Sequence, residues 1–275
     1  MNQKKFNTKI MGVINANEDS FYKKSRFDET NVIHTIESMI NNGASIIDIG
    51  AVSSRPGSLT VEASEELRRI KPICDVIYQQ NLQDKITFSI DSYEPIVLDY
   101  ALNKGFSIVN DITGLINDDV AKITSSYNAK LVIMHMQKNP KNMQDNPNYD
   151  NVITEVDSFF SKQIQKAKDF GIKDIILDVG IGFGKTLEHN LTLLKNLDYY
   201  NKYGYEILMG ASRKSMINNI VPSSIEERLP GTLAIHLESI NKGASIIRCH
   251  DVKEHHQAIK VQDAILNQRY YGYDE

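Results

Sequence analysis

Polar side chains recur in this sequence directly after short apolar runs. They are Asn15, Asp48, Asp91, Asn110-Asp111, His135, Asp178, Ser212-Arg213-Lys214 and Arg248-Cys249-His250-Asp251. A single Asp or Asn at such a position is more often a turn residue or a helix cap than a ligand. Eight such positions in one chain are harder to explain as turns, and they indicate that the side chains converge on one pocket.

Three of these residues suit a basic heterocycle. Asp91 and Asp178 each follow an apolar run, where a carboxylate is costly to bury unless it accepts hydrogen bonds. Together with the amide of Asn110 they match a ring edge rich in N–H donors, such as a 2-amino-4-oxo pterin or a guanine-like ring. These residue types therefore predict an acidic pocket for a heterocycle.

A second group of residues suits an anion. Lys214, Arg248 and His250 supply positive charge and hydrogen-bond donors, which a phosphate or pyrophosphate requires. Asn15 adds a neutral oxygen of the kind that Mg²⁺ accepts beside waters and substrate phosphates. We therefore expect a cationic rim on the opposite side of the pocket mouth, with magnesium near Asn15.

Two further motifs are weaker. The segment Gly180–Thr186 looks like a phosphate-binding P-loop, but the required spacing puts Val179 where the first glycine should stand, so we reject a nucleoside triphosphatase. The histidines His236, His255 and His256 fall within predicted helices, where a solvated or packed histidine is much more common than a metal ligand.

Eight apolar, β-branched runs alternate with segments of helical period and would position these side chains. The expected strands are Lys9–Ala16, Ser45–Ser53, Ile86–Ser92, Ile108–Gly114, Lys130–Gln137, Ile175–Gly184, Glu206–Arg213 and Ser245–Val252. Strands that are apolar almost throughout are typical of a parallel sheet buried on both faces. Segments Asp28–Asn42 and Glu62–Gln80 show the apolar stripe of a helix that covers such a sheet.

Four of the expected helices end alike, with Gly43, Gly105, Gly171 and Gly243 before the next apolar run. Glycine past a helix end adopts the left-handed conformation that closes the helix. Eight βα units in 275 residues favour a closed (β/α)8 TIM barrel over an open doubly wound sheet, with residues 1–275 as a single domain. The carboxyl ends of the strands carry the chemistry in such a barrel, and the polar residues fall there.

The segment Lys138–Asp150 breaks the alternation because it is rich in Asn and Pro and too polar to pack. It would form a long loop after the fifth strand. A surface connection and an active-site lid both fit this composition, and the position at a strand's carboxyl end favours the lid.

Composition argues against several classes of protein. The 31 basic and 35 acidic residues are mixed along the chain and give a net charge of −4, which argues against a nucleic-acid partner. Cys74 and Cys249 lack metal-ligand spacing and are expected to be buried thiols in a reducing compartment. No signal peptide is evident, and no stretch approaches the ~20 apolar residues of a membrane span. We expect a cytoplasmic protein without a membrane partner.

The polar positions lie within longer motifs that closely resemble the dihydropteroate synthase family. These motifs run from about Ile10 to Ile259 and read MGVINANEDSF, GASIIDIGAVSSRPGS, SIDSYEPIVLDYALNKGFSIVNDITG, LVIMHMQKNPKNMQ, IILDVGIGFGKTLEHNLTLL, GASRKSMI and GASIIRCHDVKE. The resemblance implies a pterin-binding TIM barrel, usually a homodimer, that joins a pterin pyrophosphate to 4-aminobenzoate with the help of Mg²⁺.

The resemblance also implies roles for the matching positions. Those for the pterin are Asp91, Asn110, Asp178 and Lys214. Those for the leaving pyrophosphate are Arg248 and His250, with Asn15 for Mg²⁺ and pyrophosphate. Those for 4-aminobenzoate and the loops that close over the site are Phe21, Ser54, Arg55, Pro56, Phe183 and Ser215. Asp91, Lys214 and Arg248 are the expected catalytic residues.

The sequence departs from the family pattern at three places. The first loop reads Asn17-Glu18 where a Thr-Pro pair is usual, Lys23-Lys24 stands where Asp-Gly is common, and Val52 replaces a usual Glu. These changes bear on the 4-aminobenzoate site and on the response to sulfonamides that mimic it.

Two other functions remain open at the level of sequence. A pterin-dependent methyltransferase domain would share the barrel and the acidic pocket, but it has no use for a pyrophosphate-binding rim. A pterin-binding protein without catalysis would fit the altered first loop.

Overall fold

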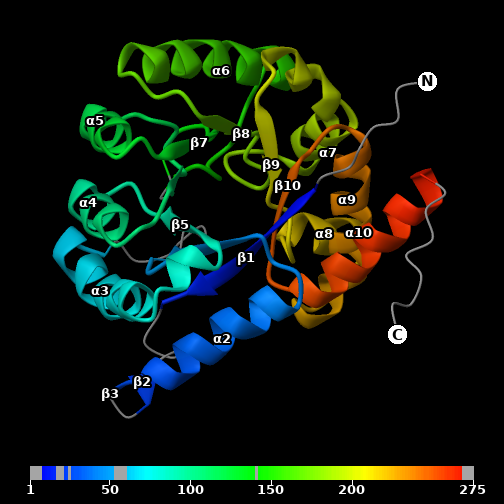
Figure 1. Ribbon diagram of the computed structural model, residues 1–275. Helices are drawn as coiled ribbons and strands as arrows, with labels where there is room; N and C mark the ends of the chain where they lie inside the picture. Colours follow the sequence, from blue (N-terminus) through cyan, green and yellow to red (C-terminus); the bar gives the residue numbers. More distant parts are fainter. Residues whose placement is uncertain (1–7, 17–21, 24–25, 53–60, 140–141, 268–275) are drawn as a thin grey trace.

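The computed structural model describes residues 8–16, 22–23, 26–52, 61–139 and 142–267, in which parallel strands form a closed barrel surrounded by helices (Figure 1). β1 (Lys9–Asn15) pairs with both β4 (Ile46–Gly50) and β10 (Ile246–Cys249), which closes the sheet. The remaining barrel strands are β5 (Thr87–Asp91), β6 (Ile108–Asp111), β7 (Lys130–Met134), β8 (Ile175–Asp178) and β9 (Glu206–Met209). The expected (β/α)8 TIM barrel is confirmed, and the open sheet is wrong.

Helices connect successive strands and cover the outside of the barrel (Figure 1). They are α2 (Glu29–Asn41), α3 (Ala63–Gln79), α4 (Pro95–Asn103), α5 (Asp118–Ser126), α6 (Val152–Asp169), α7 (Leu187–Lys195), α8 (Ser215–Ile220), α9 (Leu229–Asn241) and α10 (Val252–Asn267). Short 3-10 helices η1 (Leu82–Asp84), η2 (Leu197–Tyr203) and η3 (Glu226–Arg228) and a two-stranded antiparallel sheet of β2 (Tyr22–Lys23) and β3 (Arg26–Phe27) complete the described part.

The expected helix endings and apolar stripes are present. Gly43, Gly105, Gly171 and Gly243 all have positive φ, between 81° and 104°, so each closes its helix in the left-handed conformation. On α3, buried residues recur with helical spacing against the sheet. The apolar stripes of the helices pack against outward-facing strand residues. Together they form the main core, which lies between the barrel wall and the helices.

The barrel interior is built in layers, because alternate residues of each strand point inward. One layer is wholly apolar and comprises Met11, Ile46, Ile108, Val132, Ile176, Leu208 and Ile246. Two residues further along four of these strands stand the polar side chains of Asp48, Asn110, Asp178 and Arg248. The apolar layer is therefore the floor on which a polar layer rests at the carboxyl ends of the strands.

Most strands end earlier than the sequence pattern indicated. β8 stops at Asp178 rather than Gly184, because Gly180, Gly182 and Gly184 have φ values of 68°, 83° and 58°, which no strand accommodates. The residues after β6, β8 and β9 instead form turns at the mouth of the barrel. Among the described residues, no helix is long and apolar enough to span a membrane, and both cysteines are buried free thiols.

Candidate active site at the carboxyl end of the barrel

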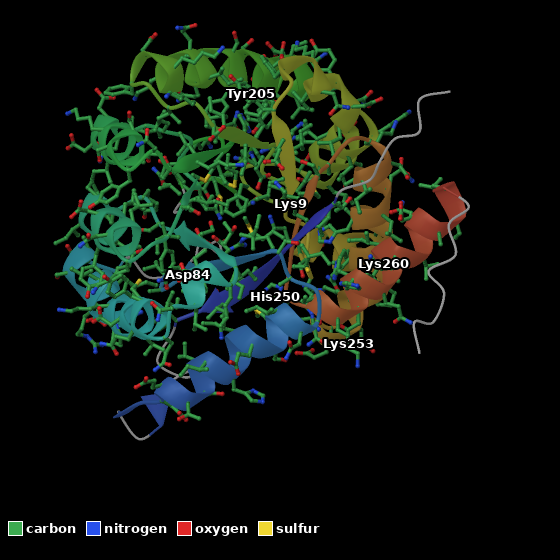
Figure 2. The ribbon with its side chains drawn as sticks, viewed as in Figure 1. Lys9, Asp84, Tyr205, His250, Lys253 and Lys260 are labelled. Carbon is green, nitrogen blue, oxygen red and sulfur yellow. The ribbon has the colours of Figure 1, made fainter. Side chains whose placement is uncertain are left out.

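A cavity of about 890 Å³ opens at the carboxyl ends of the strands. Its lining includes many of the residues that the sequence singled out, namely Asn15, Asp91, Phe183, Lys214, Ser215, Arg248 and His250. Figure 2 labels His250 just past β10, toward the end to which the β1 arrow points, and Lys9 at the opposite end of β1. Side chains from distant parts of the sequence therefore converge, but the lining does not include Asp48, Asn110, Asp111, His135 or Asp178, so the expected convergence of all eight strand ends is only partly met.

Arg248 lies at the centre of the polar layer. Its Nε donates to Oδ2 of Asp48 at 2.6 Å, and its Nη2 donates to Oδ2 of Asp91 at 2.7 Å. The same Asp48 oxygen accepts from Nδ2 of Asn110 at 3.0 Å, and Asp48 is fully buried. The acidic and cationic groups are thus interleaved, whereas the sequence had suggested opposite sides of the mouth.

Burial controls the electrostatics of this layer. It raises the pKa of Asp91, and the neighbouring Arg248 offsets part of that effect. Burial likewise raises the pKa of Asp178, whose Oδ1 accepts a 2.7 Å hydrogen bond from the Gly180 amide. Burial lowers the pKa of Arg248, but Asp48 and Asp91 more than compensate, so the net pKa is raised. The site therefore holds one permanent cation among acids that gain from further donors.

Lys214 enters the cavity from the loop between β9 and α8. Its ammonium donates to the carbonyl of Ile181 and stands 4.5 Å from the ring centroid of Phe183. Burial lowers the pKa of Lys214 to about 8, and Asp178 opposes that effect. Lys214 therefore stays a cation near neutral pH and joins the β8 and β9 loops across the cavity.

The segment Gly180–Thr186 resembles a P-loop, but its lysine binds backbone carbonyls of the protein. Lys185 is 4% exposed and turns inward, with Nζ donating to the carbonyls of His135, Gly180 and Phe183 at 3.2, 3.0 and 2.9 Å. Its Nζ is also 3.0 Å from Nδ1 of His135. Lys185 thus holds the turn that presents Phe183, and rejection of a triphosphate site agrees with this geometry.

The mouth is bordered by the segments after β9 and β10. Ser212 Oγ is 2.9 Å from Nδ1 of His250, and Arg213 forms a two-bond ion pair with Asp251 at 2.9 and 2.5 Å. These contacts join the segment that carries Lys214 to the segment that carries Arg248 and His250. Lys214, Arg248 and His250 therefore have fixed relative positions beside the acidic layer.

Comparisons with known proteins agree with this geometry. A family model described as pterin binding enzyme matches residues 11–250. The dihydropteroate synthase of Escherichia coli K12 is 38% identical over 95% of this chain and 94% of its own length. The chain belongs to the dihydropteroate synthase family.

Two further relatives define how far the similarity extends. A bifunctional dihydropteroate synthase/dihydropteroate reductase of Helicobacter pylori is 41% identical over 92% of this chain, which spans 66% of that longer protein. A solved dihydropteroate synthase of Clostridium difficile, determined in the presence of pteroic acid, superposes with a TM-score of 0.86 at 38% identity and covers 96% of this chain and 98% of its own.

The described structure accounts for most of the positions that the family pattern singles out. Asn110 and Asp178 lie buried in the polar layer, 4% and 7% exposed. Phe21, Ser54, Arg55, Pro56 and the altered Asn17-Glu18 and Lys24 lie outside the described residues. Val52, which departs from the family pattern, lines the cavity.

The loop after β7 contacts the site. Met143 is buried and, with Gln144, lines the cavity. Gln144 Nε2 donates to the carbonyl of Gly182 at 2.8 Å, and the Tyr149 hydroxyl donates to the carbonyl of Gly184 at 2.7 Å. The loop thus packs on the β8 turn at the mouth, while its proposed motion as a lid stays a prediction.

The sequence predicts no role for two residues of the site. Asp48 was visible as the single charge in the strand sequence IIDIG, and such a residue must find a buried partner. In the sequence, Lys185 only resembles the lysine of a P-loop. Both hold neighbouring groups in place, and neither role follows from spacing alone.

Proposed function

We infer that this protein is a dihydropteroate synthase, which condenses (7,8-dihydropterin-6-yl)methyl diphosphate with 4-aminobenzoate and releases diphosphate. The observation that carries this conclusion is the cavity in which Asp91, Lys214, Arg248 and His250 face one space. Relatives of the dihydropteroate synthase family that match nearly the whole chain support it. We further propose that residues 1–275 form one barrel domain.

The polar layer is suited to the pterin ring. We assign the ring's N–H edge to Asp91, Asn110 and Asp178, because burial raises the pKa of both acids and donors on the ring would offset their lost hydration. Lys214 would donate to the pterin oxo group. Donors of the ring would compete with Arg248 for Asp91, while the bond to Asp48 keeps the guanidinium in place.

The second half of the cavity would hold the two reacting groups. Arg248 and His250 would bind the diphosphate, since both line the cavity at the mouth. Phe183 and Ser215 line the same cavity and would contact 4-aminobenzoate. Ser54 and Arg55 would close over the site, as the family resemblance implies.

The reaction needs no protein nucleophile. The bond between the pterin methylene carbon and the diphosphate oxygen breaks first, and both electrons leave with the diphosphate. The amine nitrogen of 4-aminobenzoate then forms a bond to that carbon and loses a proton. Asp91 would stabilise the cationic pterin, and Arg248 and His250 would stabilise the departing diphosphate, so catalysis comes from positioning and from charge.

We propose Mg²⁺ as the metal cofactor. Among the described residues no cluster of three or more His, Cys, Asp or Glu side chains could hold a metal ion, so no protein cage is available. Asn15 at the cavity wall offers one neutral oxygen, which fits an ion held mainly by substrate phosphates and water. Bound there, the ion would neutralise charge on the diphosphate.

The alternatives fit less well. A pterin-dependent methyltransferase has no use for a cationic mouth, and here Lys214 and Arg248 both line the cavity beside the imidazole of His250. We also propose that the protein is a cytoplasmic homodimer. The buried free thiols of Cys74 and Cys249 support a reducing compartment.

The decisive experiment measures diphosphate release with the purified chain. Release should require both 4-aminobenzoate and the pterin diphosphate, and it should fall when Mg²⁺ is chelated. Binding of the pterin without any release, under conditions where a known synthase turns over, would instead support a non-catalytic pterin-binding protein.

A further inference from the structure

Helix α9 holds the loop that carries Lys214. The Ala211 amide donates to Nε2 of His236 at 3.0 Å, and the Arg213 amide donates to Oγ1 of Thr232 at 3.0 Å. Nη1 of Arg228 donates to the carbonyl of Arg213 at 3.1 Å. Thr232 and His236 lie four residues apart on one face of α9, and Arg228, the residue just before the helix, precedes Thr232 by the same spacing. Together they enforce the left-handed backbone of Arg213, whose φ is 55°.

His236 continues from this stripe into a second imidazole. Its Nδ1 lies 2.8 Å from Nε2 of His255, and Nδ1 of His255 lies 2.7 Å from the carbonyl oxygen of Asp251. Each ring is 1% exposed. The chain of bonds therefore starts at a backbone donor, Ala211, and ends at a backbone acceptor, Asp251.

The backbone donor at one end and the backbone acceptor at the other determine which imidazole nitrogens carry a proton. Nε2 of His236 accepts from an amide and carries no proton, so the neutral ring is protonated at Nδ1 and donates to His255. Nε2 of His255 then accepts, and its Nδ1 carries the proton that is donated to Asp251. Both rings are therefore neutral and each has one tautomer. Burial lowers the pKa of both rings, which agrees with this arrangement.

These hydrogen bonds form a closed loop that links the segment of Lys214 to the segment of Arg248 and His250. Asp251 accepts from His255 through its carbonyl and pairs with Arg213 through its carboxylate. Arg213 precedes Lys214, and Asp251 follows Arg248 and His250 in the sequence. The distance from Lys214, which we assign to the pterin, to Arg248 and His250, which we assign to the diphosphate, thus depends on this loop of hydrogen bonds.

We propose that His236 and His255 are positioning residues, forming a neutral two-histidine relay that fixes the Lys214 loop to the segment of Arg248 and His250. This inference rests on the proposed function of those two segments. Neither histidine lines the cavity, so neither contacts substrate. The competing explanation is that both are packed core residues whose hydrogen bonds matter for stability alone.

Kinetics of paired variants separate these explanations. His236→Leu and His255→Leu should each lower kcat roughly tenfold or more, because displacement of a catalytic group by a fraction of an ångström is sufficient. The double variant should be no slower than the worse single variant, since one break opens the relay. His236→Gln, whose side-chain oxygen can still accept from Ala211, should recover part of the loss. His256→Leu, adjacent on α10 but outside the relay, should keep wild-type kcat.

An unchanged kcat in folded His236→Leu and His255→Leu variants, with lowered thermal stability, would overturn the proposal. If the leucine variants do not fold, the same comparison is made with His236→Phe and His255→Phe, which keep a buried ring but cannot hydrogen-bond, and an unchanged kcat there has the same meaning.

A second measurement is independent of turnover. Nitrogen-15 NMR of the imidazoles should show the Nδ1–H tautomer for both rings, and a proton on Nε2 of His236 would refute the relay even in an active enzyme. If the wild-type chain releases no diphosphate, the proposed function fails, whereas the tautomers and the effect of His236→Leu on pterin binding still test the relay.

Discussion

The two ends of the barrel each hold a network of three charged side chains, and the networks differ in how deeply they are buried. At the amino end, Glu206 bridges Lys9 and Lys130 at 2.8 and 3.1 Å, with side chains between 29% and 39% exposed. At the carboxyl end, Arg248 pairs with Asp48 and Asp91 at the cavity, and these side chains are 25%, 0% and 14% exposed. All three members of the first network are partly solvated, whereas the second is built around a carboxylate with no exposure.

The difference separates charges that lose little hydration on folding from charges that lose more. Partly exposed ion pairs gain little from pairing but also lose little hydration, so their net contribution is roughly 0–1 kcal/mol. Buried charges lose their hydration, and pairing rarely returns more than that loss. Burial accordingly raises the pKa of Asp91 and Asp178. The carboxyl end is therefore electrostatically unfavourable when empty, which suits a site whose donors arrive with the substrate.

The largest effect is expected for Asp91→Asn. The variant keeps the shape of the side chain but removes the charge that would stabilise the cationic pterin, so kcat/KM should fall by roughly 1,000-fold, as for other lost transition-state contacts. Its fold should be retained, because Arg248 keeps its bond to Asp48. Diphosphate release and thermal unfolding test this together, and near-normal turnover of a folded variant would remove Asp91 from the mechanism.

The next effect concerns stability against pH at Glu66, which is 5% exposed on α3. Burial raises its pKa to about 7, while a hydrogen bond with Ser92 and the nearby Arg69 oppose this and Glu94 adds to it. Between the ordinary glutamate pKa of 4.5 and about 7, the folded state holds a proton that the unfolded state has released. The free energy of unfolding should therefore decrease as pH rises through this window, by up to about 3 kcal/mol.

Urea unfolding at several pH values measures this slope. Glu66→Gln cannot ionise, so its stability should lack that part of the decrease and should exceed wild type at pH 7.5. Equal slopes for the two proteins between pH 4.5 and 7 would mean that Glu66 is ionised when folded.

A third prediction contrasts two lysines of the carboxyl end. Lys214→Ala should weaken pterin binding by roughly 10- to 100-fold, the worth of one charged hydrogen bond, with little change in Mg²⁺ affinity. Lys185→Met should instead lower stability, because three carbonyl acceptors lose their donor. Calorimetric titration of each ligand and thermal unfolding separate the two. A collapse of metal affinity in Lys214→Ala with intact pterin binding would exchange the assigned roles.

The same contrast explains what sequence could and could not predict. The barrel followed from local patterns, since apolar strands, helical stripes and closing glycines each depend on neighbours in sequence. Candidate site residues were visible because charges are unusual in such strands, as at Asp48 and Arg248. Their pairing was not visible, because these two residues lie 200 positions apart and meet through the closed sheet. The inward turn of Lys185 depends on the positive φ of Gly180 and its neighbours, which no spacing rule encodes.

The smallest effect is expected at the amino end, where Glu206→Gln removes the charge that Lys9 and Lys130 share. Those lysines are partly solvated, so the free energy of unfolding should fall by less than about 1 kcal/mol and less still at high salt. Kinetic constants should match wild type, because the apolar layer of Met11, Ile46 and their neighbours separates this network from the cavity. Urea unfolding at 0.05 and 0.5 M salt, with diphosphate release on the same samples, makes the test. A loss of turnover comparable with that of Asp91→Asn would mean that the two ends are coupled through the strands, and the division of the barrel into a stabilising and a chemical end would have to be abandoned.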